Sequence, residues 1–106
     1  MKKGRVNQKA NYTQEEIRSM QALSGKTLSA LRSYDGSQVE KLSEVAQLEQ
    51  QIDDMTEEYR ERHLQRMREG LCSEEACILY SEMLTDFERI GDHVLNIAQA
   101  YQKMRI

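Results

Sequence analysis

The sequence predicts an all-α fold, an antiparallel up-down three-helix bundle. Proline and tryptophan are absent from the 106 residues, glycine occurs only 5 times, and residues that favour helices dominate. Apolar residues recur at steps of three and four in three long segments, which is the spacing of one helix face. Turns near Gly36 and Gly70 separate these segments. A chain of this length forms a single domain with one modest core.

The first predicted helix begins at Thr13. Thr13 and Glu16 have the spacing of a capping box, in which each side chain bonds the other residue's backbone amide. Residues 1–12 are basic and carry few apolar side chains, so we expect a flexible leader or linker stub there and a bundle over residues 13–106. The predicted buried stripe of this helix comprises Ile17, Met20, Ser24, Thr27, Leu31 and Tyr34, broadened by Leu23 and Leu28.

The second predicted helix begins at another capping box, Ser37 with Glu40, and ends near Glu69 because Gly70 follows. Its expected buried face comprises Val45, Leu48, Ile52, Met55, Tyr59, His63 and Met67.

The third helix is expected to start after Ser73, which suits an N-cap position, and to run to about Met104. Gly91 lies inside it at a cost of about 1 kcal/mol relative to alanine, so either a neighbour approaches closely there or the helix tolerates the loss. With no fourth helix available, we also expect part of the third helix to face another chain or domain. Its expected buried face comprises Met83, Phe87, Ile90, Val94, Ile97 and Tyr101.

Two acidic pairs point to a metal site. Glu49 and Asp53 stand four apart on the second helix, and Glu88 and Asp92 stand four apart on the third. A hairpin that turns near Cys72 places the two pairs at nearly the same height. Clustered carboxylates repel one another unless cations intervene, and iron, manganese or magnesium suit such oxygen ligands. The competing interpretation is a solvated helix face, since acidic residues four apart are common in a chain with 31% charged residues.

Several other classes of protein are disfavoured. A net charge of −3 gives no basic face for nucleic acid, and no apolar run approaches the roughly 20 residues of a membrane span. The chain has no phosphate-binding glycine loop, nucleophile elbow or Glu-x-x-His pair, so we do not expect an enzyme. Cys72 and Cys77 are too few for a disulfide framework, and we expect free thiols in a reducing cytoplasm. His63 is expected in the core with Glu82 as its partner.

Residues 86–98, DFERIGDHVLNIA, resemble the signature LERIGDH-x-x-NIA of the PhoU family. Upstream, residues 60–67 and 70–72 resemble the run R-x-x-H-I-x-R-L…G-x-C in the cytosolic PhoU-like tail of sodium/phosphate cotransporter family proteins. The resemblance spans about residues 15–100.

The resemblance implies a three-helix repeat whose E/D-x-x-x-D motifs hold a metal cluster, with Glu49, Asp53, Glu88 and Asp92 as ligands and iron, zinc, manganese or magnesium as the ion. It also implies regulation of phosphate uptake through contact with a transporter's membrane domain or a phosphate-signalling protein. The expected location is the cytoplasm, with membrane association if the chain is the tail of a transporter. Free-standing PhoU proteins have two such repeats, so a single repeat favours a fragment, a tail domain or a self-associating copy. The alternative function is a metal-free helical protein-interaction module.

Overall fold

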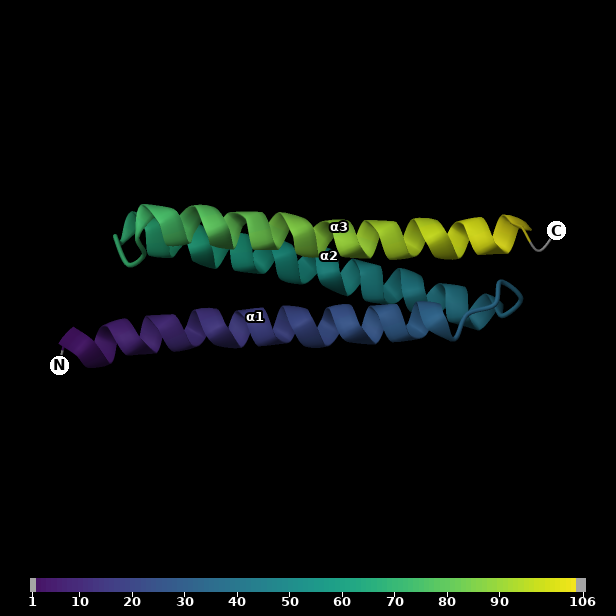
Figure 1. Ribbon diagram of the computed structural model, residues 1–106, viewed down its shortest axis with the longest axis horizontal. Coiled ribbons are helices and arrows are strands. Elements are labelled where there is room, and N and C mark those ends of the chain that lie inside the picture. The colour runs from purple at the N-terminus through teal and green to yellow at the C-terminus, as the bar shows by residue number, and fades with distance from the viewer. Residues whose placement is uncertain (1, 105–106) are drawn as a thin grey trace.

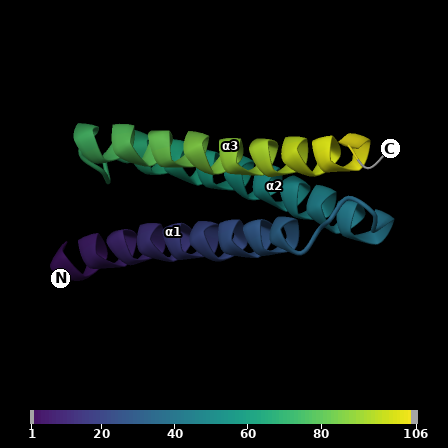
Figure 2. The ribbon, with the colours of Figure 1, turned by 45° about the vertical axis from the view of Figure 1, so that its right-hand side comes forward.

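The computed structural model describes residues 2–104, with side chains for residues 13–104. It contains three helices, α1 (Lys2–Arg32), α2 (Val39–Arg68) and α3 (Glu74–Met104). The helices alternate in direction, and α2 tilts from α1 at its N-terminal end toward α3 at its C-terminal end (Figures 1 and 2). The predicted all-α up-down bundle is therefore confirmed.

The expected start of the first helix at Thr13 is wrong, because α1 begins at Lys2. The backbone of residues 2–12, expected as a flexible leader, continues the helix. Lysine, glutamine and alanine in this segment are good helix formers, and no proline interrupts them. Glu16 consequently lies inside the helix and is buried rather than acting as a cap.

The other two helix starts differ in how they are capped. The second capping box does not form, because the Ser37 amide and hydroxyl both donate to Asp35 Oδ1 and Gln38 becomes an N-cap without a side-chain bond. The prediction for Ser73 is confirmed, since its Oγ accepts a bond from the Ala76 amide at 3.1 Å. Gly36 and Gly70 have φ values of 92° and 66°, which other residues rarely adopt, so glycine suits both turns.

The core follows stripes that differ in part from the predicted ones. In α3, Phe87 and Val94 are buried as expected, but Met83 and Ile97 remain 39% and 43% exposed. Two interleaved three-four stripes share Phe87 and Val94, and the bundle buries the one that includes the small Gly91. The buried residues of α3 are Cys77, Tyr80, Leu84, Phe87, Gly91, Val94 and Ala98.

A similar shift occurs in α2, where Thr56 and Arg66 are buried instead of Met55 and Met67. Thr56 satisfies its hydroxyl by donating to the Ile52 carbonyl at 2.8 Å, one turn earlier. Burial of this hydroxyl therefore leaves no unpaired polar group.

Gly91 is a point of close contact between α2 and α3. A methyl group added at Gly91 would lie 3.2 Å from both Cδ1 and Cγ2 of Ile52, which has no exposed surface. Of the two alternatives for this glycine, a close neighbour is confirmed, and the neighbour is the α2 helix.

A charged network joins the helices near the α2–α3 turn. Arg66 donates to both carboxylate oxygens of the buried Glu16, at 2.8 and 3.2 Å, and the Tyr80 hydroxyl donates to the same carboxylate. Arg62 adds a longer contact of 3.4 Å. Burial acts to raise the pKa of Glu16, but the bonds from Arg66 and Tyr80 and the charge of Arg66 outweigh it and lower that pKa. This network links all three helices.

Two smaller predictions near the α2–α3 turn are wrong. Cys72 and Cys77 form a disulfide rather than free thiols, because the turn and the first turn of α3 bring their Cα atoms to 6.1 Å. His63 is buried as expected, but its Nε2–H donates to the Cys77 carbonyl at 3.0 Å instead of bonding Glu82. Its ring also packs on Tyr80, with 4.8 Å between ring centroids.

Candidate metal centre

The contact between Ile52 and Gly91 sets the height of the acidic residues. Asp53 and Asp92 are the next residues along α2 and α3, so the tight contact places them within about 3 Å of the same level on these antiparallel helices. Glu49 lies one turn before Asp53 on the same face of α2. Packing in the core therefore brings the carboxylates together.

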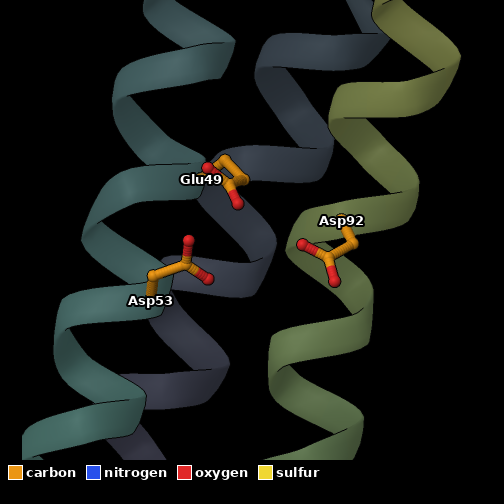
Figure 3. A group of neighbouring side chains, drawn as sticks. All are labelled: Glu49, Asp53 and Asp92. Atoms are coloured by element: carbon orange, nitrogen blue, oxygen red, sulfur yellow. The ribbon is translucent and has the colours of Figure 1, made fainter.

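Three of the four predicted ligands converge. One oxygen from each of Glu49, Asp53 and Asp92 lies within 4.8 Å of the other two. Figure 3 shows the two α2 side chains pointing toward Asp92 on α3. Glu49 and Asp53 are half-buried and Asp92 is exposed, so the group opens to solvent along one edge.

Glu88 does not join this group. Its carboxylate faces the Arg60 guanidinium on α2 at 3.9 Å, and that guanidinium also donates to the Thr85 hydroxyl at 3.2 Å. Arg60 therefore gives the Glu88 carboxylate a partner of opposite charge outside the acidic group. Glu88 lies about one helical turn before Asp92 on α3 and is not among the carboxylates that converge.

The two aspartates affect the protonation of Glu49. Burial first, and then hydrogen bonds and charges from Asp53 and Asp92, raise the pKa of Glu49 from 4.5 to about 7. A proton on Glu49 therefore offsets part of the negative charge of the group near neutral pH. A cation would do the same more completely, because it attracts all three carboxylates at once.

The donor set fits a single hard cation. Oxygens around an octahedral Mg²⁺ lie about 3 Å apart at neighbouring positions and about 4 Å apart at opposite ones. The distances among the three carboxylate oxygens, at most 4.8 Å, are only slightly longer than these. Small rotations of the side chains bring the oxygens into the range that the ion requires. A set of oxygens alone suits magnesium, manganese or iron better than zinc, whose protein ligands usually include nitrogen or sulfur.

The fold and this acidic group define a class of protein: a helical bundle that presents carboxylates shared between two helices. The family model of the PhoU domain matches residues 17–101, which is most of the chain. The chain therefore belongs to the PhoU domain family. Searches of curated proteins and of solved structures returned no match.

Membership of the PhoU family indicates a role in phosphate homeostasis, and PhoU domains are regulatory rather than enzymatic. Among the described residues, no helix has the length and apolar character that crossing a membrane requires.

The sequence interpretation missed the Glu16 network altogether. Glu16 was read as part of a capping box, yet it stands four residues before Met20 on the buried face of α1. Arg66 likewise follows His63 at the helical step of three on α2. A negative charge on the buried face of α1 and a positive charge on the buried face of α2 were the sequence signal for this ion pair.

Proposed function

We propose that this PhoU domain regulates phosphate uptake and that it binds one divalent cation through Glu49, Asp53 and Asp92. The observation that carries the proposal is the convergence of three carboxylate oxygens from two helices. Regulation of phosphate homeostasis follows from the family, whereas the cation is our addition. When bound, the ion supplies positive charge that joins α2 to α3.

Such an ion would act by changing the rigidity of the helix pair. Without it, repulsion among the carboxylates favours separation of α2 and α3 at this level. With it, the same groups hold the two helices together. A partner that recognises one spacing of α2 and α3 would then sense the occupancy of the site.

The test is calorimetric titration of the purified chain with Mn²⁺ and with Mg²⁺, together with metal analysis of the protein as purified. We expect one ion per chain. Asp53→Asn removes a ligand charge at nearly constant size and is expected to weaken binding by about tenfold or more.

The matched control is Asp54→Asn, which changes the neighbouring carboxylate. Asp54 is exposed and accepts a bond from Gln50 at 3.0 Å, away from the three ligands. It should bind the cation as the unmodified chain does. Equal affinities in the two variants, or no binding in the unmodified chain, would contradict the metal proposal and favour a metal-free interaction module.

We further propose that the partner is the membrane domain of a sodium/phosphate cotransporter or a phosphate-signalling protein in the cytoplasm. This rests on the resemblance of residues 60–72 to the cytosolic tails of such transporters. The test is phosphate uptake by cells that express either the unmodified gene or its Asp53→Asn form. A changed rate of uptake supports the proposal, and identical rates contradict it.

A further inference from the structure

The disulfide between Cys72 and Cys77 joins the α2–α3 turn to the first turn of α3. Cys77 is buried, with 9% of its surface exposed, whereas Cys72 is half-buried. Residues 73–76 between them are exposed, so a reagent in solution reaches the bond most easily at Cys72. Exposed disulfides are the ones that dithiols reduce most readily.

A series of contacts connects this disulfide to α1. The Cys77 carbonyl accepts a bond from His63 Nε2 at 3.0 Å, and the His63 ring packs against Tyr80. The Tyr80 hydroxyl donates to the Glu16 carboxylate, which also accepts bonds from Arg66. All of these side chains are buried, so a shift of one displaces the next, because a packed interior has little free space.

The part of α1 near the α2–α3 turn is held mainly by these polar contacts. Among the α1 residues whose side chains the structure describes, Glu16 is the first that is buried, and the next is Met20, one turn later. Ile17 is only partly buried. At this end α2 leans toward α3 and away from α1 (Figures 1 and 2), and an open groove of about 590 Å³ lies between α1 and α2 beside Glu16 and Arg66. The attachment of residues 13–19 therefore depends on the Glu16 network.

We propose that the Cys72–Cys77 disulfide is a redox-sensitive clasp that controls how firmly residues 13–19 of α1 are held. In the oxidised chain the bond fixes the first turn of α3, which keeps His63 and Tyr80 in place against the Glu16 network. In the reduced chain this turn frays more readily, as helix ends do, and the network loosens. Residues 13–19 then open from the bundle, while α1 stays packed from Met20 onward.

The clasp and the acidic group are separate features of the molecule. Cys77 and Asp92 lie about 22 Å apart along α3, so the clasp does not depend on cation binding.

The proposed reductant is a dithiol of the Cys-x-x-Cys class. One of its thiolates attacks the Cys72 sulfur, the bond between the two cysteines breaks, and the electron pair leaves on Cys77, which takes up a proton. The second thiol of the reductant loses its proton and attacks the reductant sulfur that is bonded to Cys72, so Cys72 is released and protonated in turn. Two electrons and two protons pass to the chain, and the reductant leaves as a disulfide. An oxidised dithiol reverses the reaction.

Hydrogen exchange followed by mass spectrometry tests the clasp on the unmodified chain, before and after reduction with dithiothreitol at one pH. We expect exchange to become about tenfold faster or more in residues 13–19 and 74–80, and to stay unchanged in residues 23–32. Reoxidation should restore the slow rates. Faster exchange confined to residues 71–77, or spread over the whole chain, would overturn the proposal. So would a disulfide that dithiothreitol does not reduce while the chain is folded.

Cys72→Ser controls for effects of the reductant that do not involve the disulfide. This variant lacks the bond under all conditions. Residues 13–19 should therefore exchange quickly both with and without dithiothreitol, and slow exchange in this variant would also overturn the proposal.

His63→Phe tests the path between the disulfide and α1. A phenyl ring still packs against Tyr80 but cannot donate to the carbonyl on α3, so reduction should speed exchange in residues 13–19 by only about twofold or less. The matched control is His93→Phe, the same change at an exposed position of α3, which should keep the full response. Equal responses of the two variants would refute the path through His63. Circular dichroism of each variant confirms that the helices are intact.

Discussion

Gly91→Ala tests whether close packing between α2 and α3 determines the stability of the bundle. Two opposing effects meet at this position. Alanine favours a helix interior over glycine by about 1 kcal/mol. The added methyl group, however, meets Ile52 at 3.2 Å, and overpacking of a core costs about 1–3 kcal/mol.

The identity of the neighbour decides the balance. Ile52 is completely buried, and its side chain is branched at Cβ, so it has few rotamers by which to move aside. We therefore expect the packing cost to win and Gly91→Ala to lower the free energy of unfolding by about 1 kcal/mol.

Gly25→Ala supplies the matched control. Gly25 lies inside α1, and a methyl group added there meets nothing within 4 Å. Only the helix preference remains, so this substitution should raise the free energy of unfolding by up to about 1 kcal/mol. The difference between the two variants, about 2 kcal/mol, measures the packing cost.

Urea unfolding followed by circular dichroism measures both variants. If Gly91→Ala stabilised the protein as much as Gly25→Ala does, the tight contact with Ile52 would be refuted as the reason for glycine at this position.

Three further predictions concern charge and the disulfide. Because the pKa of Glu16 is lowered, the stability that its charge contributes is present above pH 4.5 and is lost as the pH falls through the folded-state pKa. In urea unfolding, Glu16→Gln should reduce this acid dependence and lower the free energy of unfolding by about 3 kcal/mol at neutral pH. The control, Glu15→Gln, should change the stability little. Because the pKa of Glu49 is raised to about 7, the metal-free protein should lose stability as the pH rises toward 7, and calorimetry should find cation affinity falling below that pH. Thiol titration should detect no free thiol before reduction, and thiols that react without reductant would contradict the pairing of Cys72 with Cys77. Cys72→Ser should lower the free energy of unfolding by about 2 kcal/mol, because the disulfide closes only a short loop.

The fold could be predicted from the sequence because it depends on local signals. The absence of proline, the glycines at the two turns and the Ser73 cap all act within a few residues of the chain. The start of α1 was harder to place, since a capping box inside a longer helix has the same sequence as one at its end.

The candidate site was predicted in part for a similar reason. Spacing along each helix and the hairpin geometry were enough to bring Glu49, Asp53 and Asp92 together. They were not enough to place Glu88, because its position depends on where the long Arg60 side chain extends from α2. Interactions made by the ends of long side chains between helices leave no periodic signal in a sequence.

The glycine and the carboxylates are connected by the same helix contact. Ile52 precedes Asp53 and Gly91 precedes Asp92, so a methyl group that pushes Ile52 away also moves the two aspartates apart. We therefore expect Gly91→Ala to weaken Mn²⁺ binding by a few fold, less than Asp53→Asn does, because side-chain rotation recovers part of the lost distance. Gly25→Ala should leave the affinity unchanged, since Gly25 lies on α1 and the ligands lie on α2 and α3. Calorimetry on the folded variants separates this effect from global stability. Undiminished affinity in Gly91→Ala would mean that the spacing of α2 and α3 does not control the site.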